Sequence, residues 1–381
     1  MKCQSGSSNA QTRGRRLAPL LLVALSPALF AACSEEDASK PHASGAPAHP
    51  ATGERVERAL KGDRLVAAPR TEKLKPSARE TVSGSTASAE PLSKFFRALN
   101  ELKTGVRETP VTVLHLGDSH IAADRFTGPF RSLFQERFGD AGRGMMMPGF
   151  PFPYYRAQGA QFSRSGNWSA ANSFKKDPGP YGISGVRLTA REKGARLTLE
   201  GTDGPFEWAE VTFATGPKRG DASVSFGGSE QTVSTRAAKS GINRVQIPSK
   251  GRKLTVTTKD KAPVSILSWS VGQNRPGVRY VNFGIPGASA DLPRRWNDGL
   301  VDDDLARLKP DLIVLGYGTN EGFHDDLDIA AYEARVADLV TRFKARAPQA
   351  SILIVGPPDG LRFPRFARPK SKKATASAPC R

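Results

Sequence analysis

Short apolar runs alternate with segments of helical periodicity in two zones of the chain. Runs typical of buried strands occupy residues 111–116, 278–283, 312–315 and 352–355. Apolar residues spaced three and four apart predict helices over residues 91–102, 130–138, 302–309 and 329–347. Because strands that alternate with helices imply a parallel sheet with right-handed crossovers, we expect an α/β fold in these zones.

The zone between them has a different texture. Residues 155–271 form short runs in which polar and apolar residues alternate, punctuated by Gly201, Gly216 and Gly251. This pattern predicts a β-sandwich inserted into the α/β domain. We therefore expect a β domain at residues 155–275, with the α/β domain split into residues 91–154 and 276–359. With 381 residues and 38% hydrophobic content, the chain can bury a substantial core.

The sequence of the N-terminal region is typical of an export signal. Three arginines precede the apolar stretch 17–32, which is too short to span a bilayer comfortably, so residues 1–32 are expected to be a signal peptide. The junction 29–33 resembles a bacterial lipoprotein cleavage box, which predicts a lipid-anchored Cys33 at the envelope membrane; Phe30 departs from that pattern, and simple secretion is the alternative. Residues 33–90 are rich in Ala, Pro, Ser and Gly and predict a disordered tether.

The formal charge of +19 does not indicate nucleic-acid binding once its distribution is considered. Four positive charges belong to the signal and seven to the last twenty residues, so eight remain over the rest of the chain. We expect a moderately basic, solvated surface, and no nucleic-acid partner. Of the cysteines, Cys3 leaves with the signal and Cys33 takes lipid, so Cys380 alone supports neither a disulfide framework nor a zinc site. No cofactor or metal is expected.

Three polar loops follow strand-like runs and carry candidate chemistry. They are Gly117-Asp118-Ser119-His120, Asn282-Phe283-Gly284-Ile285-Pro286-Gly287 and Gly316-Tyr317-Gly318-Thr319-Asn320. The carboxyl ends of parallel strands meet at one sheet edge, so these loops should converge. A serine that attacks an ester needs donors for the tetrahedral oxyanion and a base. Ser119 is the candidate nucleophile, and the N–H groups of Ser119 and Gly287 with the Asn320 carboxamide are the candidate donors; a helix-capping role for Ser119 is the alternative.

Together, the order and spacing of these blocks resemble SGNH or GDSL-type hydrolases. The resemblance assigns the catalytic roles to Ser119, Gly287 and Asn320. It implies a flavodoxin-like α/β/α sandwich and hydrolysis of esters, often acetyl groups on sugars. A β-rich insertion between the first two blocks is similar to peptidoglycan O-acetylesterases, so the implied substrate is an acylated carbohydrate of the envelope or another small ester.

The chain departs from the family's pattern after residue 355. The family's final Asp-x-x-His block has no counterpart there, and residues 360–381 form a basic, irregular tail. Truncation or a frameshift is the leading explanation, which predicts a sheet without its last strand, an unprotected edge at residues 352–355 and impaired turnover. Among the histidines, His115 is expected to be a satisfied core residue and His120 to point away from Ser119, which leaves His324 as the substitute base to test.

Several other residues allow a purely structural interpretation as well as a functional one. Trp208, Trp269 and Tyr181 could stack on sugars, although a sandwich core is the more common use of such residues. Residues 302–304 are three aspartates that suit the first turn of a helix better than a metal site, and Asp118 suits a structural hydrogen bond better than a triad acid. Three functions stay open: a carbohydrate esterase, a non-catalytic glycan-binding envelope lipoprotein, and an acyltransferase that uses the same serine.

Overall fold

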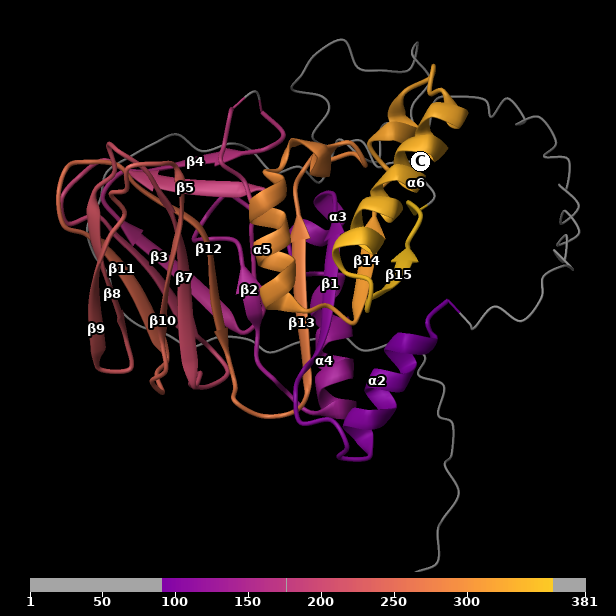
Figure 1. Cartoon of the computed structure of the whole chain (residues 1–381), viewed down its shortest axis with the longest axis horizontal. Helices are drawn as coiled ribbons and strands as arrows, with labels where there is room; N and C mark the ends of the chain where they lie inside the picture. The colour runs from indigo at the N-terminus through magenta and orange to yellow at the C-terminus, as the bar shows by residue number, and fades with distance from the viewer. Residues whose placement is uncertain (1–90, 176, 359–381) are drawn as a thin grey trace, which may run out of the picture. The chain divides into compact units, whose positions relative to one another are not determined.

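A computed structural model describes residues 91–358 of the chain, apart from residue 176. The predicted signal peptide, the Cys33 lipidation site, the tether and the basic tail lie outside the described residues. Figure 1 shows the described part as an α/β portion beside an all-β portion, with helix α5 between the viewer and their junction.

The α/β portion is built on four parallel strands in the order β13-β1-β14-β15. The central strand β1 is buried along its whole length, as expected for a parallel strand with neighbours on both sides and helices on both faces. Each strand corresponds to one of the apolar runs in the sequence. The strands are β1 (Val111–Gly117), β13 (Val278–Gly284), β14 (Leu312–Gly316) and β15 (Ser351–Ile354).

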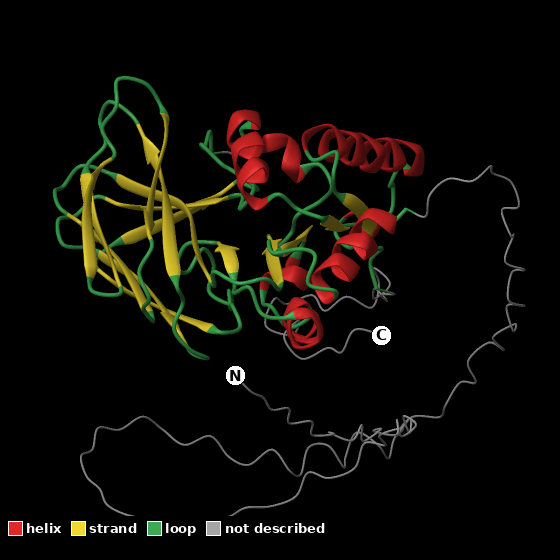
Figure 2. Cartoon of the chain, turned by 60° about the horizontal axis from the view of Figure 1, so that its bottom comes forward, coloured by secondary structure: helices red, strands yellow, loops and turns green. Residues whose placement is uncertain are grey.

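Alternate residues of β1 face opposite helical layers. Val111 and Val113 pack in a cluster with α2 and α4, whereas Leu114 and Leu116 pack in a cluster with α5 and α6. The sheet is therefore covered on both faces, which confirms the predicted α/β/α sandwich (Figure 2). The helices are α2 (Ser93–Lys103), α4 (Thr127–Phe138), α5 (Asp298–Leu308) and α6 (Ile329–Arg346).

The β portion consists of two antiparallel sheets, which confirms the predicted β insertion. One sheet has the order β10-β7-β12-β5-β4 with β2 paired to β12, and the other has the order β3-β6-β11-β8-β9. The strands are β2 (Gly144–Met146), β3 (Ala160–Ser165), β4 (Trp168–Asn172), β5 (Val186–Ala190), β6 (Arg196–Gly201), β7 (Trp208–Thr215), β8 (Asp221–Phe226), β9 (Ser229–Ser234), β10 (Gly241–Ile247), β11 (Lys253–Thr258) and β12 (Val264–Gly272).

The two portions share one hydrophobic core. A single cluster of buried side chains runs from the β sheets to the inner residues of β1, β13 and β14. Ion pairs reinforce the junction: Arg244 of β10 pairs with Asp303 and Asp304 of α5, and Glu210 of β7 pairs with Arg307. Because breaking this junction would expose apolar surface and unpair buried charges, we expect the portions to unfold together.

The expectation that the aromatic residues are core residues holds for two of the three, and the expectation for the aspartates needs correction. Trp269 and Tyr181 are buried in the shared core, so neither is available to stack on a sugar, whereas Trp208 is only partly buried. The aspartates at 302–304 lie in the middle of α5 and not in its first turn. Asp304 is buried there because its carboxylate accepts hydrogen bonds from the Ile183 N–H and from Arg244. Within residues 91–358, no group of three or more His, Cys, Asp or Glu side chains is placed to hold a metal ion.

Candidate active site

The three polar loops leave the sheet at the same level. Gly117, at the end of β1, is in register with Gly284 of β13 on one side and with Gly316 of β14 on the other. Ser119, Gly287 and Asn320 follow these glycines by two, three and four residues. The backbone register therefore brings all three segments to one edge of the sheet, as the sequence predicts.

Two of these glycines are required by close packing at that edge. A Cβ at Gly117 would lie 2.5 Å from the Gly316 carbonyl oxygen, and a Cβ at Gly284 would lie 2.3 Å from the backbone nitrogen of Ala122. Ala122 ends the short helix α3 (Ser119–Ala122), which crosses the sheet edge directly above β13. The glycines therefore let the backbone that begins at Ser119 lie close against the strands.

Ser119 is exposed and lines a cavity of about 800 Å³, which we call the serine cavity. Asp118, at the N-cap of α3, is buried and accepts a hydrogen bond from the His120 N–H. This cap turns the chain so that Ser119 begins the helix with its side chain at the cavity. The other walls of the cavity come from the segment after β14, from residues 123–126 and 154–156, and from residues 355–358.

The Gly287 and Asn320 segments are joined by hydrogen bonds. Asn320 Nδ2 donates to the Ala288 carbonyl oxygen at 2.7 Å, and the Ala290 N–H donates to Glu321 Oε1 at 2.8 Å. Gly287 itself has a φ of 80°, a conformation that favours glycine. These bonds fix one amide hydrogen of Asn320 and leave the other for a ligand.

Two backbone donors at this edge are unused. The N–H groups of Ser119 and Gly287 have no hydrogen-bond acceptor among the described residues. Thr319, next to Asn320, lines the serine cavity with Ser119, but Asn320 and Gly287 are not part of its lining. The structure thus brings the three segments to one edge and joins two of them directly, with Ser119 in the adjoining cavity.

His120 is held by the residue that caps α3. Its Nδ1 lies 2.9 Å from Asp118 Oδ1, and the imidazole is about half exposed at the serine cavity. Asp118 therefore makes the structural hydrogen bond predicted from the sequence and also orients a histidine beside the candidate nucleophile. The sequence argument considers only Ser119 and His120, which are neighbours and are expected to direct their side chains apart. It does not predict the contact between Asp118 and His120, which are two residues apart. His324 is exposed and does not line this cavity.

His115 is not the fully satisfied core histidine that the sequence predicts. Its Nδ1 is 2.8 Å from the Tyr280 hydroxyl, but its buried Nε2 has no partner among the described residues. The residue lines the base of the serine cavity, and burial lowers its pKa to about 4. Burial disfavours the charged imidazole, so His115 is neutral at physiological pH.

Two aromatic residues shape this edge. Tyr317 is buried at the serine cavity, and burial together with the charges of Asp118 and Glu321 raises the pKa of its hydroxyl. Phe174, half exposed, comes from the β portion and covers Gly287: a Cβ on that glycine would lie 3.3 Å from the Phe174 ring. Arg295 holds the Phe174 backbone by donating to its carbonyl oxygen at 2.8 Å. Nothing in the local sequence marks Phe174, because its position depends on contacts between distant segments.

Comparison with known proteins agrees with this geometry. Residues 255–378 match the model of the GDSL-like Lipase/Acylhydrolase family. A peptidoglycan O-acetylesterase of known structure is 27% identical over 73% of this chain and 75% of its own, with a TM-score of 0.61. This part of the chain is therefore similar to GDSL-like lipases and acylhydrolases. This confirms the resemblance drawn from the three blocks.

The matched range of the family model includes the Gly287 and Asn320 blocks but not Ser119, because the β portion separates the first block from the other two. Carbohydrate esterases of family two from Cellvibrio japonicus and Clostridium thermocellum are each 12% identical, covering 51% and 58% of this chain and 79% of their own, with TM-scores of 0.20. No curated protein matches the chain.

Proposed function

We propose that this protein hydrolyses O-acetyl esters on carbohydrate of the bacterial envelope, with Ser119 as the nucleophile. The observation that carries the proposal is the common register of Gly117, Gly284 and Gly316, from which the three polar loops reach one sheet edge. The similar solved structure is a peptidoglycan O-acetylesterase, which favours an acetylated glycan as the substrate.

In the proposed reaction, the Ser119 hydroxyl attacks the ester carbonyl and the sugar alcohol leaves. The tetrahedral oxyanion would accept hydrogen bonds from the N–H groups of Ser119 and Gly287 and from the amide hydrogen of Asn320 that Ala288 does not use. Water then hydrolyses the acetyl-serine and releases acetate. Donors fixed before the reaction stabilise the developing charge without reorganisation, which is the main contribution expected of this edge.

We propose that proton transfer is the weak step in this chain. Of the described histidines, His115 and His120 line the serine cavity. His115 is neutral, but its Nε2 is buried beneath the cavity, whereas His120 is oriented by Asp118 without a hydrogen bond to Ser119. A hydrolase that lacks an effective base loses about 10⁴ to 10⁶ in rate but keeps about 10³ over water from its oxyanion donors and binding contacts. We therefore expect slow but measurable turnover.

The test compares three chains on 4-nitrophenyl acetate and on acetylated peptidoglycan. Ser119→Ala should lose hydrolysis, and Ser165→Ala should retain it, because Ser165 is an exposed serine on β3, away from the serine cavity. Equal hydrolysis by the native chain and Ser119→Ala would reject Ser119 as the nucleophile.

The second candidate function is glycan binding without catalysis. It is favoured by the same lack of a base bonded to Ser119 among residues 91–358. Retained binding of acetylated peptidoglycan with no release of acetate, and no difference between the native chain and Ser119→Ala, would support it over the esterase.

We propose that the mature protein is attached to the envelope membrane through a lipid on Cys33. The support comes from the apolar stretch 17–32 and the cleavage-box pattern before Cys33. In the described part of the chain, no helix is both long and apolar enough to cross a bilayer. Mass spectrometry of the N-terminal peptide tests the anchor: a diacylglyceryl adduct on Cys33, absent from Cys33→Ala, is expected, and an unmodified mature peptide would indicate simple secretion.

A further inference from the structure

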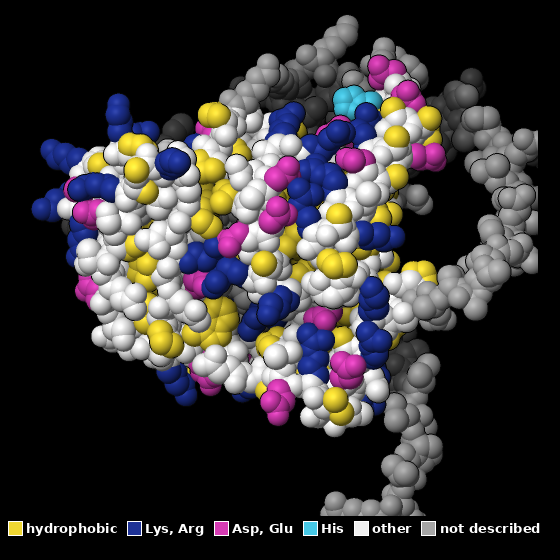
Figure 3. All heavy atoms as spheres, viewed as in Figure 1, with side chains coloured by type: hydrophobic (Ala, Val, Ile, Leu, Met, Phe, Trp, Pro, Cys, Tyr) yellow, Lys and Arg dark blue, Asp and Glu magenta, His cyan; other side chains and the backbone are white. Residues whose placement is uncertain are grey.

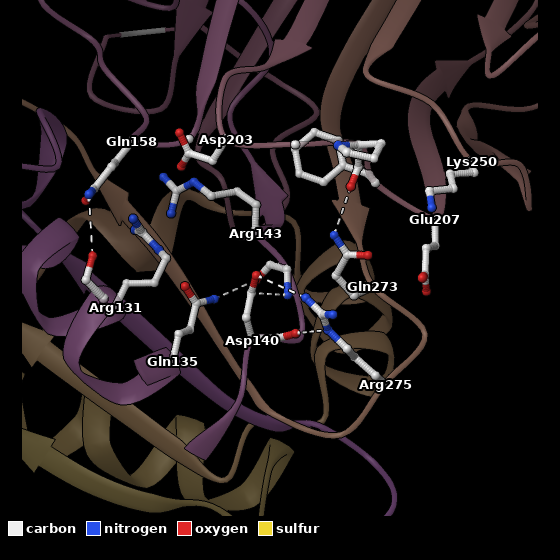
Figure 4. A pocket seen from close by; sticks show the side chains of 16 residues that line it. Arg131, Gln135, Asp140, Arg143, Gln158, Asp203, Glu207, Lys250, Gln273 and Arg275 are labelled. Atoms are coloured by element: carbon white, nitrogen blue, oxygen red, sulfur yellow. Dashed lines mark hydrogen bonds and ion pairs between the residues drawn. The ribbon is translucent and has the colours of Figure 1, made fainter. Parts of the chain in front are cut away.

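A second cavity, of about 350 Å³, lies where the α/β and β portions meet. We call it the junction cavity. One wall comes from α4 and the segment before β2, and the opposite wall comes from the loop before β7, from Lys250 and from the segment between β12 and β13 (Figure 4). The junction cavity shares no residue with the serine cavity.

Two buried arginines form one end of the junction cavity, and they share a single carboxylate. Arg131 donates to both oxygens of Asp124, at 2.8 and 2.9 Å, and also to Asn282 Oδ1 and the Tyr280 carbonyl oxygen. Arg143 donates to Asp124 Oδ2 at 2.9 Å. The two guanidinium groups therefore hold two positive charges against one negative charge in a buried place.

Arg143 is the less satisfied of the pair. Its remaining contacts, both with Asn282 Oδ1, are 3.4 Å long, and its buried Nε has no partner among the described residues. Asp124 has little capacity left to help, because its two oxygens already accept hydrogen bonds from Arg131, Thr127 and the Gln158 N–H. Arg143 thus lines the cavity and has hydrogen-bonding capacity that the described residues leave unused.

An exposed carboxylate lies at the same end of the cavity. In Figure 4 the side chains of Asp203 and Arg143 gather there with those of Arg131 and Gln158. Asp203 accepts a hydrogen bond from the Thr202 hydroxyl but makes no ion pair with any described residue. A positive donor and a negative acceptor therefore line one space without contacting each other.

The mixture of charges selects the chemistry of a ligand. An anion would meet Asp203, and a cation would meet the two arginines, so each would place like charges together. A hydroxyl group both donates and accepts hydrogen bonds, and adjacent hydroxyls can satisfy a guanidinium and a carboxylate together. The amides of Gln158, Gln135 and Gln273 extend this set of donors and acceptors along the cavity. The volume is at the small end of the range of about 300–1,000 Å³ typical of ligand pockets.

We propose that the junction cavity binds a neutral saccharide unit, with Arg143 donating to one sugar hydroxyl and Asp203 accepting from its neighbour. Only the role of this binding rests on the proposed function: the junction cavity would hold a glycan chain at a second point, away from the serine cavity. Binding here does not require Ser119, so the two proposals can fail separately.

The test uses the neutral disaccharide di-N-acetylchitobiose as the probe and the full chain with Ser119→Ala as the background. Binding is followed by chemical shift changes or calorimetry. Asp203→Ala should weaken binding by about tenfold or more, because it removes a charged hydrogen-bond acceptor. Gln158→Ala should weaken binding less. Both residues are exposed, so these variants should fold. Glu200→Ala, which removes an exposed carboxylate of β6 that is not part of either cavity, is the matched control.

Three results would overturn the proposal. The first is no detectable binding of the disaccharide at millimolar concentration, and the second is unchanged affinity in both cavity variants. The third is tight binding of sulfate that becomes tighter in Asp203→Ala, which would make the cavity an anion site. If Ser119→Ala loses ester hydrolysis but binds the disaccharide as the native chain does, both proposals are supported. If the disaccharide binds but hydrolysis is the same with and without Ser119, only the saccharide site is supported.

Discussion

The serine cavity and the junction cavity are built by different means. The serine cavity depends on backbone: three strands end in register, glycines allow close approach, and unused N–H groups are left at the edge. The junction cavity depends on side chains, chiefly two buried arginines that share Asp124. A site formed by strand ends can therefore be inferred from local sequence blocks, whereas a site between two portions depends on contacts across the junction.

Charges of both signs are interspersed on the face of the molecule that Figure 3 shows, where Lys and Arg side chains lie among Asp and Glu side chains. Ion pairs link α5 and α6 in this way: Arg346 pairs with Asp298 and Asp302, and Arg342 pairs with Asp298. Exposed pairs of this kind contribute little to stability. Substitution of the buried Asp124 should therefore have a larger and more easily measured effect on the junction cavity.

The greatest loss of stability should follow removal of the carboxylate that the two buried arginines share. Asp124→Ala would leave Arg131 and Arg143 buried without a counter-ion, and removing one partner of a buried pair costs about 3–5 kcal/mol. We expect the free energy of unfolding in urea to fall by that amount. Asp203→Ala is the control and should change it by less than about 0.5 kcal/mol, because Asp203 is exposed and unpaired. Similar losses in both variants would contradict the role of Asp124 as the shared counter-ion.

A change at Asn320, a proposed oxyanion donor, should lower the rate of hydrolysis far more than it lowers stability, which falls only by the loss of the hydrogen bond to the Ala288 carbonyl oxygen. Removing one such donor costs about 10²–10³ in kcat, so Asn320→Ala should lower the hydrolysis of 4-nitrophenyl acetate by that factor with little change in KM. Thr319→Ala is the neighbouring control at the same loop. If Asn320→Ala raises KM and leaves kcat unchanged, Asn320 binds the substrate and is not an oxyanion donor.

His115 provides a pH-dependent test of the serine cavity. Its pKa is lowered from the ordinary value of 6.5 to about 4, so the unfolded chain binds a proton first as the pH falls. The native chain should therefore lose about 2 kcal/mol more stability than His115→Gln between about pH 7.5 and about pH 5, because the variant has no imidazole to protonate. Urea titrations at the two pH values measure this difference. Equal losses would show that His115 is not held neutral by burial.

The smallest effect is expected at His120. If the imidazole oriented by Asp118 supplies part of the residual base, His120→Gln should lower hydrolysis by about tenfold. His324→Gln is the matched control, since His324 does not line the serine cavity. A larger loss in His324→Gln than in His120→Gln would reverse this assignment.

The sequence predicts the α/β sandwich because each parallel strand is one continuous apolar run and helical periodicity separates the runs. It does not predict β3, β4 or β9, whose residues are mostly exposed or half-buried and do not alternate clearly. The periodicity of α4 is also misleading: Phe130 and Leu133 fit a buried face but are 42% and 63% exposed. Periodicity reports an apolar surface, and packing decides whether that surface is covered.

The candidate site shows the same division. Ser119, Gly287 and Asn320 could be selected because each follows a strand within a few residues. The Asp118–His120 pair, the unpartnered Nε2 of His115 and Phe174 above Gly287 could not, because side-chain direction and contacts between distant segments determine them. The junction cavity lies wholly in this second category, since its walls are contributed by segments that are far apart in the chain.

Covalent trapping can identify the nucleophilic residue itself. The native chain is treated with an organophosphate ester that phosphorylates activated serines, and the modified peptide is identified by mass spectrometry. A single adduct on Ser119, absent from Ser119→Ala and from the chain unfolded in urea, is the expected result. An adduct on another residue, or hydrolysis of acetyl esters by a chain that is never labelled at Ser119, would contradict it.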